Sequence, residues 1–130
     1  MNDRRPYVAE SAIKPGTAVV QGKKDNGVCA PDKNGKGDFV GLYAWEANAH
    51  KAVGETVGIV LHGVGKALAG GTVAAGKKAV LKADGSGSLV VLSEAAGIYT
   101  VAGTFLESGS AGEYVDVLVE RGSIAVTANK

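Results

Sequence analysis

The sequence is poor in the residues that disulfides, metal sites and reactive centres most often use. Among its 130 residues there are one cysteine and two histidines, so an internal disulfide is excluded and a zinc site made of Cys and His ligands is not expected. Cys29 stands between Val28 and Ala30, a setting that predicts a packed, structural thiol. A lone cysteine also suits a chain that folds in a reducing cytoplasm.

Long apolar runs and an excess of charge of one sign are absent too. Glycine, lysine or a turn interrupts every apolar run before it reaches the roughly 18 residues of a membrane helix, and Met1 to Ser11 lack the apolar core of a signal peptide. The 14 basic and 13 acidic residues leave a formal net charge of +1, which gives no reason to expect a polyanionic partner. We therefore expect a soluble protein that binds neither membrane nor nucleic acid directly.

What the sequence does contain is glycine, valine and short turns. Its 20 glycines, with only four tyrosines and two phenylalanines, are typical of many short β-strands joined by tight turns. Pairs such as Asn26-Gly27 and Asp84-Gly85 accept positive φ and predict hairpins. The predicted strands are Thr17 to Gln21, Val28 to Ala30, Phe39 to Ala44, Thr56 to His62, Gly65 to Leu68, Ala79 to Lys82, Ser88 to Ser93, Ile98 to Leu106, Tyr114 to Glu120 and Ser123 to Val126. Helix is expected only as single turns at Trp45 to Lys51 and Ser93 to Ala96.

The first twelve residues look different from the rest of the chain. Met1 to Ala12 are mostly polar, and Tyr7 and Val8 are the main sizeable apolar side chains. Such a segment buries too little apolar surface to offset its ordering entropy. The sequence predicts a flexible, extended arm that becomes ordered when another surface receives it, with an ordinary frayed terminus as the alternative.

An internal repeat organises the remainder. Gly54 to Leu61 resembles Gly112 to Val119 with an offset of 58 positions, and Ile13 to Gly16 resembles Val73 to Gly76. We expect one domain over residues 13–130, with copies at about 13–68 and 73–126. Neither copy could bury its apolar face alone, so the two similar halves are predicted to close together into a small β-barrel or sandwich.

Several glycine-rich or acidic motifs suggest chemistry but fail in detail. Gly71 to Lys77 has the spacing of a phosphate-binding loop, yet Lys78 stands where Ser or Thr is needed and no long helix follows. Asp32 to Asp38 resembles a calcium loop without its closing glutamate, which favours a solvated turn. The glycines of Gly63-Val64-Gly65 are explained by a hairpin between two strands. No nucleophile elbow or metal cluster is recognisable, so neither an enzyme nor a cofactor is predicted.

The single tryptophan, Trp45, follows a predicted strand. Tryptophan is enriched at binding hot spots, but one in a small domain can equally cap the core. A module that binds carbohydrate or another ligand on Trp45, Tyr43 and Tyr99 is therefore the alternative function.

The order of these motifs resembles a known family. Gly54 to Gly63, Val73 to Gly85 and Ala111 to Gly122 carry the likeness, which is to the capsid cement, or head decoration, proteins of tailed bacteriophages. The resemblance implies a β-barrel-like domain, commonly trimeric, that binds the outer surface of an icosahedral head after assembly in the host cytoplasm. It implies the major capsid protein and a homotrimer as partners, and a role in stabilising the shell against internal pressure.

In that reading the amino-terminal arm and the tryptophan make the contacts. Arg4 and Arg5 would meet acidic patches, and Tyr7 and Val8 would fill a groove on the shell or on a sister subunit. Trp45 would be an interface anchor.

Overall fold

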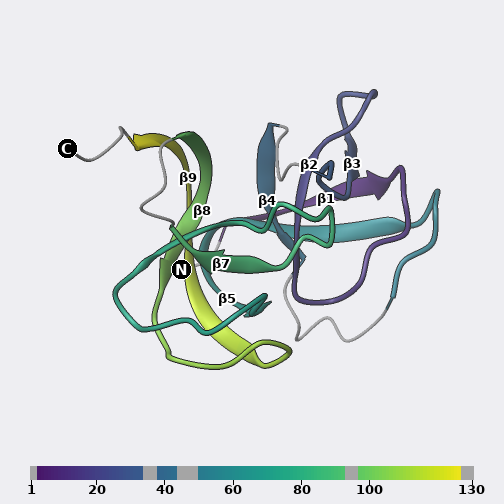
Figure 1. The fold of residues 1–130 in the computed structure, drawn as a ribbon. Helices are drawn as coiled ribbons and strands as arrows, with labels where there is room; N and C mark the ends of the chain where they lie inside the picture. The colour runs from purple at the N-terminus through teal and green to yellow at the C-terminus, as the bar shows by residue number, and fades with distance from the viewer. Residues whose placement is uncertain (1–2, 34–37, 44–49, 93–96, 127–130) are drawn as a thin grey trace.

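The computed structural model describes residues 3–33, 38–43, 50–92 and 97–126 (Figure 1). These residues form nine strands and no helix, which confirms the predicted all-β class. The two predicted helical turns fall largely on residues 44–49 and 93–96, outside the described residues. The strands are β1 (Asp3–Ala9), β2 (Thr17–Gln21), β3 (Gly27–Cys29), β4 (Phe39–Tyr43), β5 (Thr56–Leu68), β6 (Lys78–Leu81), β7 (Leu89–Val91), β8 (Gly97–Phe105) and β9 (Tyr114–Val126).

The first half of the chain closes a barrel of its own. Its strands follow the order β1-β3-β2-β4-β5, and β1 also pairs with β5, so the ring of five strands has no free edge. The interior side chains belong to one apolar cluster, which includes Val57 and Ile59 at alternate positions of the predicted strand Thr56 to His62. The expectation that both halves are needed to close one barrel is wrong, because β1 supplies the fifth strand.

Strand β1 also corrects the prediction of a flexible arm. From Asp3 to Val8 the segment pairs antiparallel with β5, and Val8 and Ala9 pair in parallel with β3. Ala9 is buried and Tyr7 packs against the same cluster. Its backbone hydrogen bonds offset the ordering cost, although the run Arg4-Arg5-Pro6 shows no apolar alternation that would predict a strand.

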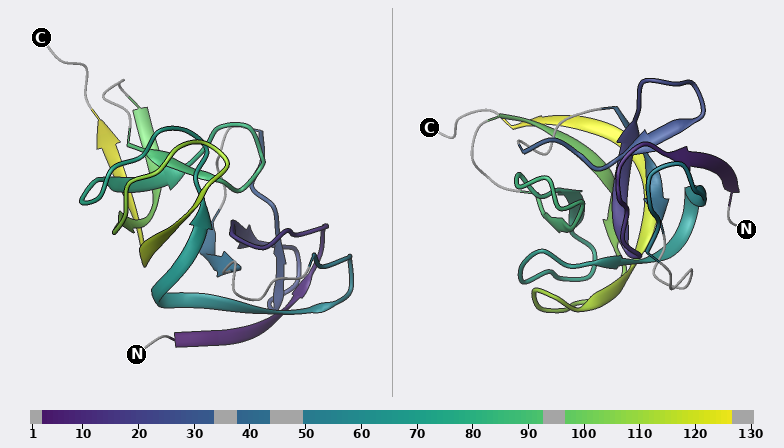
Figure 2. Two further views of the ribbon diagram at one scale, coloured as in Figure 1. Left: turned by 90° about the horizontal axis from the view of Figure 1, so that it is seen from below. Right: turned by 90° about the vertical axis from the view of Figure 1, so that its right-hand side faces the viewer.

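The long strand β5 joins the two halves (Figure 2). Its first part, up to His62, belongs to the barrel, and residues 63–68 pair with β9 in the second half. The predicted hairpin at Gly63 to Gly65 is therefore wrong. Gly63 has a φ of 122° within a continuous strand, a conformation that glycine adopts without strain, so it marks the place where the strand changes sheet.

The second half repeats the arrangement of the first. Residues 63–68 of β5 take the place of β1, and the order continues through β9, β8, β6 and β7. A parallel bridge between Ala69 and Leu89 corresponds to the parallel pairing of Ala9 with Val28. The copies in space thus begin at β1 and within β5, rather than near residues 13 and 73.

The same turn hydrogen bonds recur in both halves. The shared pairs are Gly16 N to Tyr43 O (2.6 Å) with Gly76 N to Phe105 O (2.8 Å), Ala9 N to Glu55 O (2.9 Å) with Ala69 N to Glu113 O (2.8 Å), and Gly54 N to Ala9 O (2.8 Å) with Gly112 N to Ala69 O (2.9 Å). Each glutamate also accepts a 2.6 Å bond from an amide three residues earlier. These turns explain why the Gly-Glu pair recurs in the sequence. Gly54 and Gly112 have φ of 91° and 89°, which favour glycine, and the glutamate after each one caps the turn.

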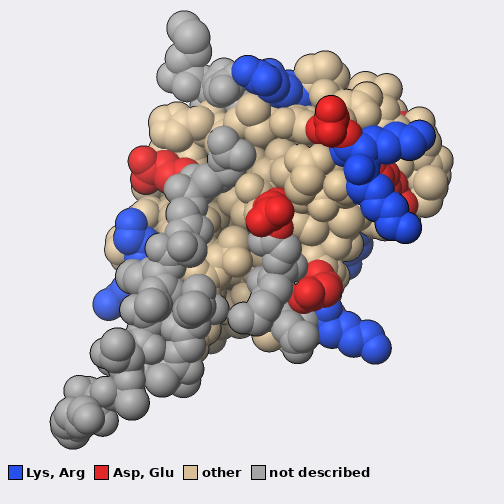
Figure 3. Space-filling model, turned by 90° about the horizontal axis from the view of Figure 1, so that it is seen from above, with Lys and Arg blue, Asp and Glu red and all other residues tan. Residues whose placement is uncertain are grey.

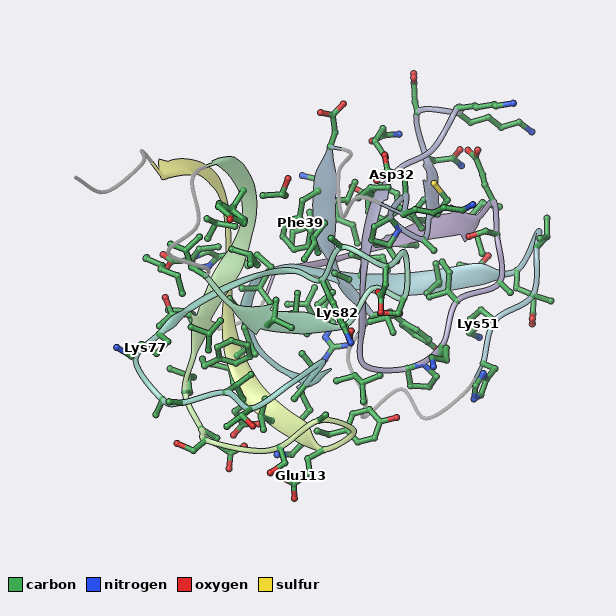
Figure 4. The ribbon with its side chains drawn as sticks, in the orientation of Figure 1. Asp32, Phe39, Lys51, Lys77, Lys82 and Glu113 are labelled. Atoms are coloured by element: carbon green, nitrogen blue, oxygen red, sulfur yellow. The ribbon has the colours of Figure 1, made fainter. Side chains whose placement is uncertain are left out.

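The halves share one apolar cluster, which makes them a single unit. The interior of the second half includes Phe105, the counterpart of Tyr43 in the first barrel, and both are almost fully buried. Figure 4 shows Phe39 on β4 pointing toward the second half. The first-half residues that belong to this cluster come from the outer face of the first barrel: Ala18, Val20, Phe39, Leu42 and Val60.

Candidate interaction surfaces

Four of the five predicted contact residues lie together on β1. Arg4 and Arg5 are exposed, whereas Tyr7 and Val8 are half-buried against the barrel. The strand therefore presents guanidinium groups at one end and apolar surface at the other. The fifth predicted residue, Trp45, lies outside the described residues.

A hollow of about 320 Å3 opens beside the end of β1. Val53, at its rim, is 68% exposed, the largest exposure among the large apolar side chains described. Most of the lining is apolar or glycine, with two lysines at the edge. The lining residues are Val8, Ala9, Glu10, Lys23, Lys24, Gly27, Val53 and Gly54.

Glu10, which the sequence did not single out, fixes the shape of this hollow. Its carboxylate accepts hydrogen bonds from the amides of Lys23 (2.8 Å) and Lys24 (2.9 Å). These backbone bonds hold the pKa of Glu10 below its usual value. A Cβ at Gly22 or Gly27 would overlap the carboxylate. The sequence signal for this contact was therefore a pair of glycines on either side of a turn that contains two lysines.

A second surface lies on the outer face of the second half, over β5, β9 and β8. Val64 pairs with Leu118, which pairs with Thr104, and this row crosses all three strands. Val64 is 41% exposed, and nearby Leu106 and Tyr114 are also exposed. The row contains the apolar Val64 and Leu118 beside the polar Thr104, and it is partly open to solvent.

An ion-pair network flanks that row. The ammonium of Lys66 lies 3.1 Å from Asp116 and 3.3 Å from Glu107. Its hydrogen bonds to Asp116 and Glu107 raise the pKa of Lys66, and the Asp116 amide and Lys66 lower the pKa of Glu107. The network joins one ammonium to two carboxylates, so it keeps a net negative charge, and Glu107 also accepts a 2.7 Å hydrogen bond from the amide of Asp116.

No large field of one sign is visible on the face seen in Figure 3, where acidic and basic side chains lie close to each other. His62 is exposed, with Nε2 3.8 Å from a carboxylate oxygen of Glu120. Within the described ranges, no three His, Cys, Asp or Glu side chains gather as a metal-binding group. In the same ranges, no helix has the length and apolarity to cross a membrane.

The alternative ligand platform is not assembled by the fold. Tyr43 is only 1% exposed, and burial raises the pKa of its hydroxyl. Tyr99 is half-buried on β8 and Trp45 is not described. Tyr43 is a core residue, so the prediction that it could stack on a ligand is wrong.

Two other sequence motifs also have structural places. Cys29 is half-buried against the apolar cluster, and desolvation raises the pKa of its thiol, as expected for a packed cysteine. The segment Gly71 to Lys77 leads into β6, a strand, rather than into the helix that a phosphate-binding loop requires.

The fold resembles a solved component of a phage head. The chain matches no known protein-family profile and no curated protein sequence. It is similar in structure to the N base of the head fiber gp8.5 of bacteriophage phi29, with a TM-score of 0.61 and 16% sequence identity. The match covers 95% of this chain and 98% of that one. The likeness therefore extends over both halves and concerns the fold.

Proposed function

We propose that this chain is a capsid decoration, or cement, protein of a tailed bacteriophage. It binds the outer surface of the assembled icosahedral head and stabilises the shell against internal pressure. The observation that carries this proposal is the match of nearly the whole chain to the base of a phage head fiber. The motif order in the sequence supports the same reading independently of the fold.

A mechanical role is consistent with the way the chain is built. The first barrel has no free strand edge, and the halves share a common apolar cluster. Such a unit resists deformation because its strands cannot separate without exposing core side chains. In this proposal the protein works as a rigid clamp between capsid subunits and catalyses no reaction.

The shell contact in this proposal is the β1 surface and its neighbouring hollow. Arg4 and Arg5 offer bidentate donors for carboxylates on the major capsid protein. The hollow beside Val53 accepts an apolar side chain, and Lys23 and Lys24 at its edge favour an acidic neighbour. Three such contacts in a homotrimer gain affinity through effective concentration, so each one can be weak.

Binding to heads that lack the protein tests the proposal. Purified protein is mixed with expanded heads, and bound protein is quantified after sedimentation, with unexpanded proheads in parallel. We expect saturable, stoichiometric binding to expanded heads and a higher resistance of those heads to heat and osmotic shock. Heads that bind nothing, or that are equally resistant without it, would contradict the proposal.

The contact surface has its own variant and control. Val53→Asp and the double variant Arg4→Glu, Arg5→Glu should each weaken head binding at least tenfold, because a charge enters the hollow or the guanidinium groups are reversed. Thr72→Asp, at an exposed position of the second half, should bind normally. Unchanged binding by both Val53→Asp and the double arginine variant would place the shell contact elsewhere.

A further inference from the structure

The hollow beside β1 has an equivalent place in the second half of the chain. In both halves the residue that begins the turn donates a backbone hydrogen bond to the residue that ends it, Gly22 to Gly27 (2.8 Å) and Lys82 to Ser88 (3.0 Å). The strand that faces each turn is also bonded in the same way, since the residue after the paired alanine donates its amide at 2.7 Å in one half and 2.8 Å in the other. The contents of the two places can therefore be compared position by position.

In the first half this place is partly open. Gly22 and Gly27 have no side chains, and the carboxylate of Glu10 lies where their Cβ atoms would be. Two backbone amides of the turn hold the carboxylate there. The space that remains is the hollow of about 320 Å3, with Val53 at its rim.

In the second half the same place is filled from within the chain. The residue in the position of the glutamate is Gly70, and a Cβ there would lie 2.6 Å from Oγ of Ser88 and 2.8 Å from Cδ of Lys82. The ammonium of Lys82 lies 3.6 Å from the carboxylate of Asp84. At the rim, Ala111 stands where the first half has a valine. The second half thus has a smaller rim and a lysine that already has an acidic neighbour.

The open hollow favours an occupant that is both apolar and acidic. Most of its lining is apolar or glycine, whereas the exposed Lys23 and Lys24 set two ammonium groups against the one carboxylate of Glu10. The lining therefore keeps an excess of positive charge, which complements a carboxylate. Its volume is near the lower end of the range for ligand sites, about 300–1,000 Å3, and suits one large side chain. Because Val53 is 68% exposed, the hollow covers only one side of its occupant, as fits a side chain that a polypeptide presents.

We propose that the hollow of the first half, and not its equivalent in the second half, binds a short polypeptide motif in which a large apolar side chain stands next to an aspartate or glutamate. Each chain then has one such site. The inference deepens the proposed function and rests on it only for the source of the motif, an exposed segment of the major capsid protein. The recognition itself depends on the hollow and on the two lysines, so a short peptide should reproduce it.

A nuclear magnetic resonance titration of the full-length, 15N-labelled protein tests this site without capsids. The probe is the capped peptide acetyl-Gly-Ser-Leu-Glu-Ser-Gly-amide, with the peptides Gly-Ser-Leu-Gln-Ser-Gly and Gly-Ser-Ser-Glu-Ser-Gly as controls. We expect saturable shifts of the amides around Val53 and the turn of Lys23 and Lys24, and none around Lys82 and Ala111. Each control peptide should bind at least about fivefold more weakly, because it lacks either the carboxylate or the apolar side chain.

A matched pair of variants separates charge at the hollow from charge in general. The double variant Lys23→Gln, Lys24→Gln keeps the backbone amides that bind Glu10 and removes both ammonium groups. It should lose the preference for the Leu-Glu peptide over the Leu-Gln peptide. The control variant Lys77→Gln, Lys78→Gln removes two adjacent exposed lysines from the second half and should keep the preference. The dispersion of each spectrum verifies that the variant is folded.

The outcomes distinguish this inference from the proposed function. Absence of saturable shifts at millimolar peptide, equal binding of the Leu-Gln peptide, or equal shifts around Lys82 and Ala111 would each overturn the inference, while head binding can still hold. A preference that survives in the Lys23→Gln, Lys24→Gln variant would overturn it too. Peptide binding as expected, in a protein that binds no heads, leaves the inference standing and contradicts the proposed function.

Discussion

The two halves of the molecule share an interior and differ on the outside. Tyr43 and Phe105 fill equivalent core positions, and the same glycine turns lead into both aromatic strands. The outer faces differ, because Leu42 in the first half is covered by the second half, whereas its counterpart Thr104 is half-buried. Where equivalent residues of the two halves differ in type, the difference shows which surfaces are covered within one chain. The predictions below compare such equivalent positions.

Removal of the core aromatics should produce the largest loss. Tyr43→Ala and Phe105→Ala should each lower the free energy of unfolding by about 3–5 kcal/mol, because each leaves a large cavity. Since the halves share a cluster, both variants should shift one common denaturation transition, followed by circular dichroism and Trp fluorescence. Two separate transitions, with each variant affecting only one, would show that the halves fold independently.

Exchange of Leu42 and Thr104 should give the next largest effect and an asymmetric result. Leu42→Thr should cost about 2–4 kcal/mol, because it removes apolar contacts and buries a hydroxyl. The reverse change, Thr104→Leu, should alter the stability of the isolated chain by less than about 0.5 kcal/mol. Urea denaturation measures both, and equal costs at the two positions would break the distinction between a covered and an open face.

The repeated Gly-Glu turns should show equal, smaller effects. Gly54→Ala and Gly112→Ala meet no neighbouring atoms, so only the strained φ opposes them, at about 1–2 kcal/mol each. Gly58→Ala, also in open space but without a positive φ, should be stabilising by about 0.4–1 kcal/mol. A loss at Gly58 as large as at the turns would contradict the assignment of strain to φ.

The smallest effect concerns Glu10, whose counterpart in the second half is Gly70. Hydrogen bonds lower the pKa of Glu10 in the folded state, so the carboxylate stabilises the fold above its ordinary pKa of 4.5. That contribution is lost as the pH falls from about 5 toward the folded-state pKa. Glu10→Gln should make the melting temperature fall less steeply as the pH is lowered. An unchanged profile would show that the Glu10 carboxylate does not accept the hydrogen bonds of Lys23 and Lys24 in solution.

Much of the fold was accessible from the sequence, because turns and alternation are local signals. Val115, Val117 and Val119 alternate along the predicted strand Tyr114 to Glu120 and are all buried, and β2 has its predicted limits. Strand β1 was not predictable in this way, since its stability comes from pairing with β5, far along the chain. The continuity of β5 was hidden for a similar reason, because glycine marks a hairpin and a change of sheet alike.

The candidate surfaces were less predictable than the fold. The predicted contact residues Arg4, Arg5, Tyr7 and Val8 do share one strand. The hollow beside them, however, depends on the hydrogen bond from the amide of Lys23 to Glu10, thirteen residues earlier in the chain. The filled place in the second half became visible only when its turn was compared with that of the first. Equivalent positions of the two halves differ in burial, and the repeat in the sequence alone does not show that difference.

The most direct test of the central claim is a cryo-electron map of expanded phage heads incubated with this protein. The account predicts added density on the outer surface, into which the nine-stranded fold fits with β1 and Val53 facing the shell. Heads without added density at saturating protein would contradict it.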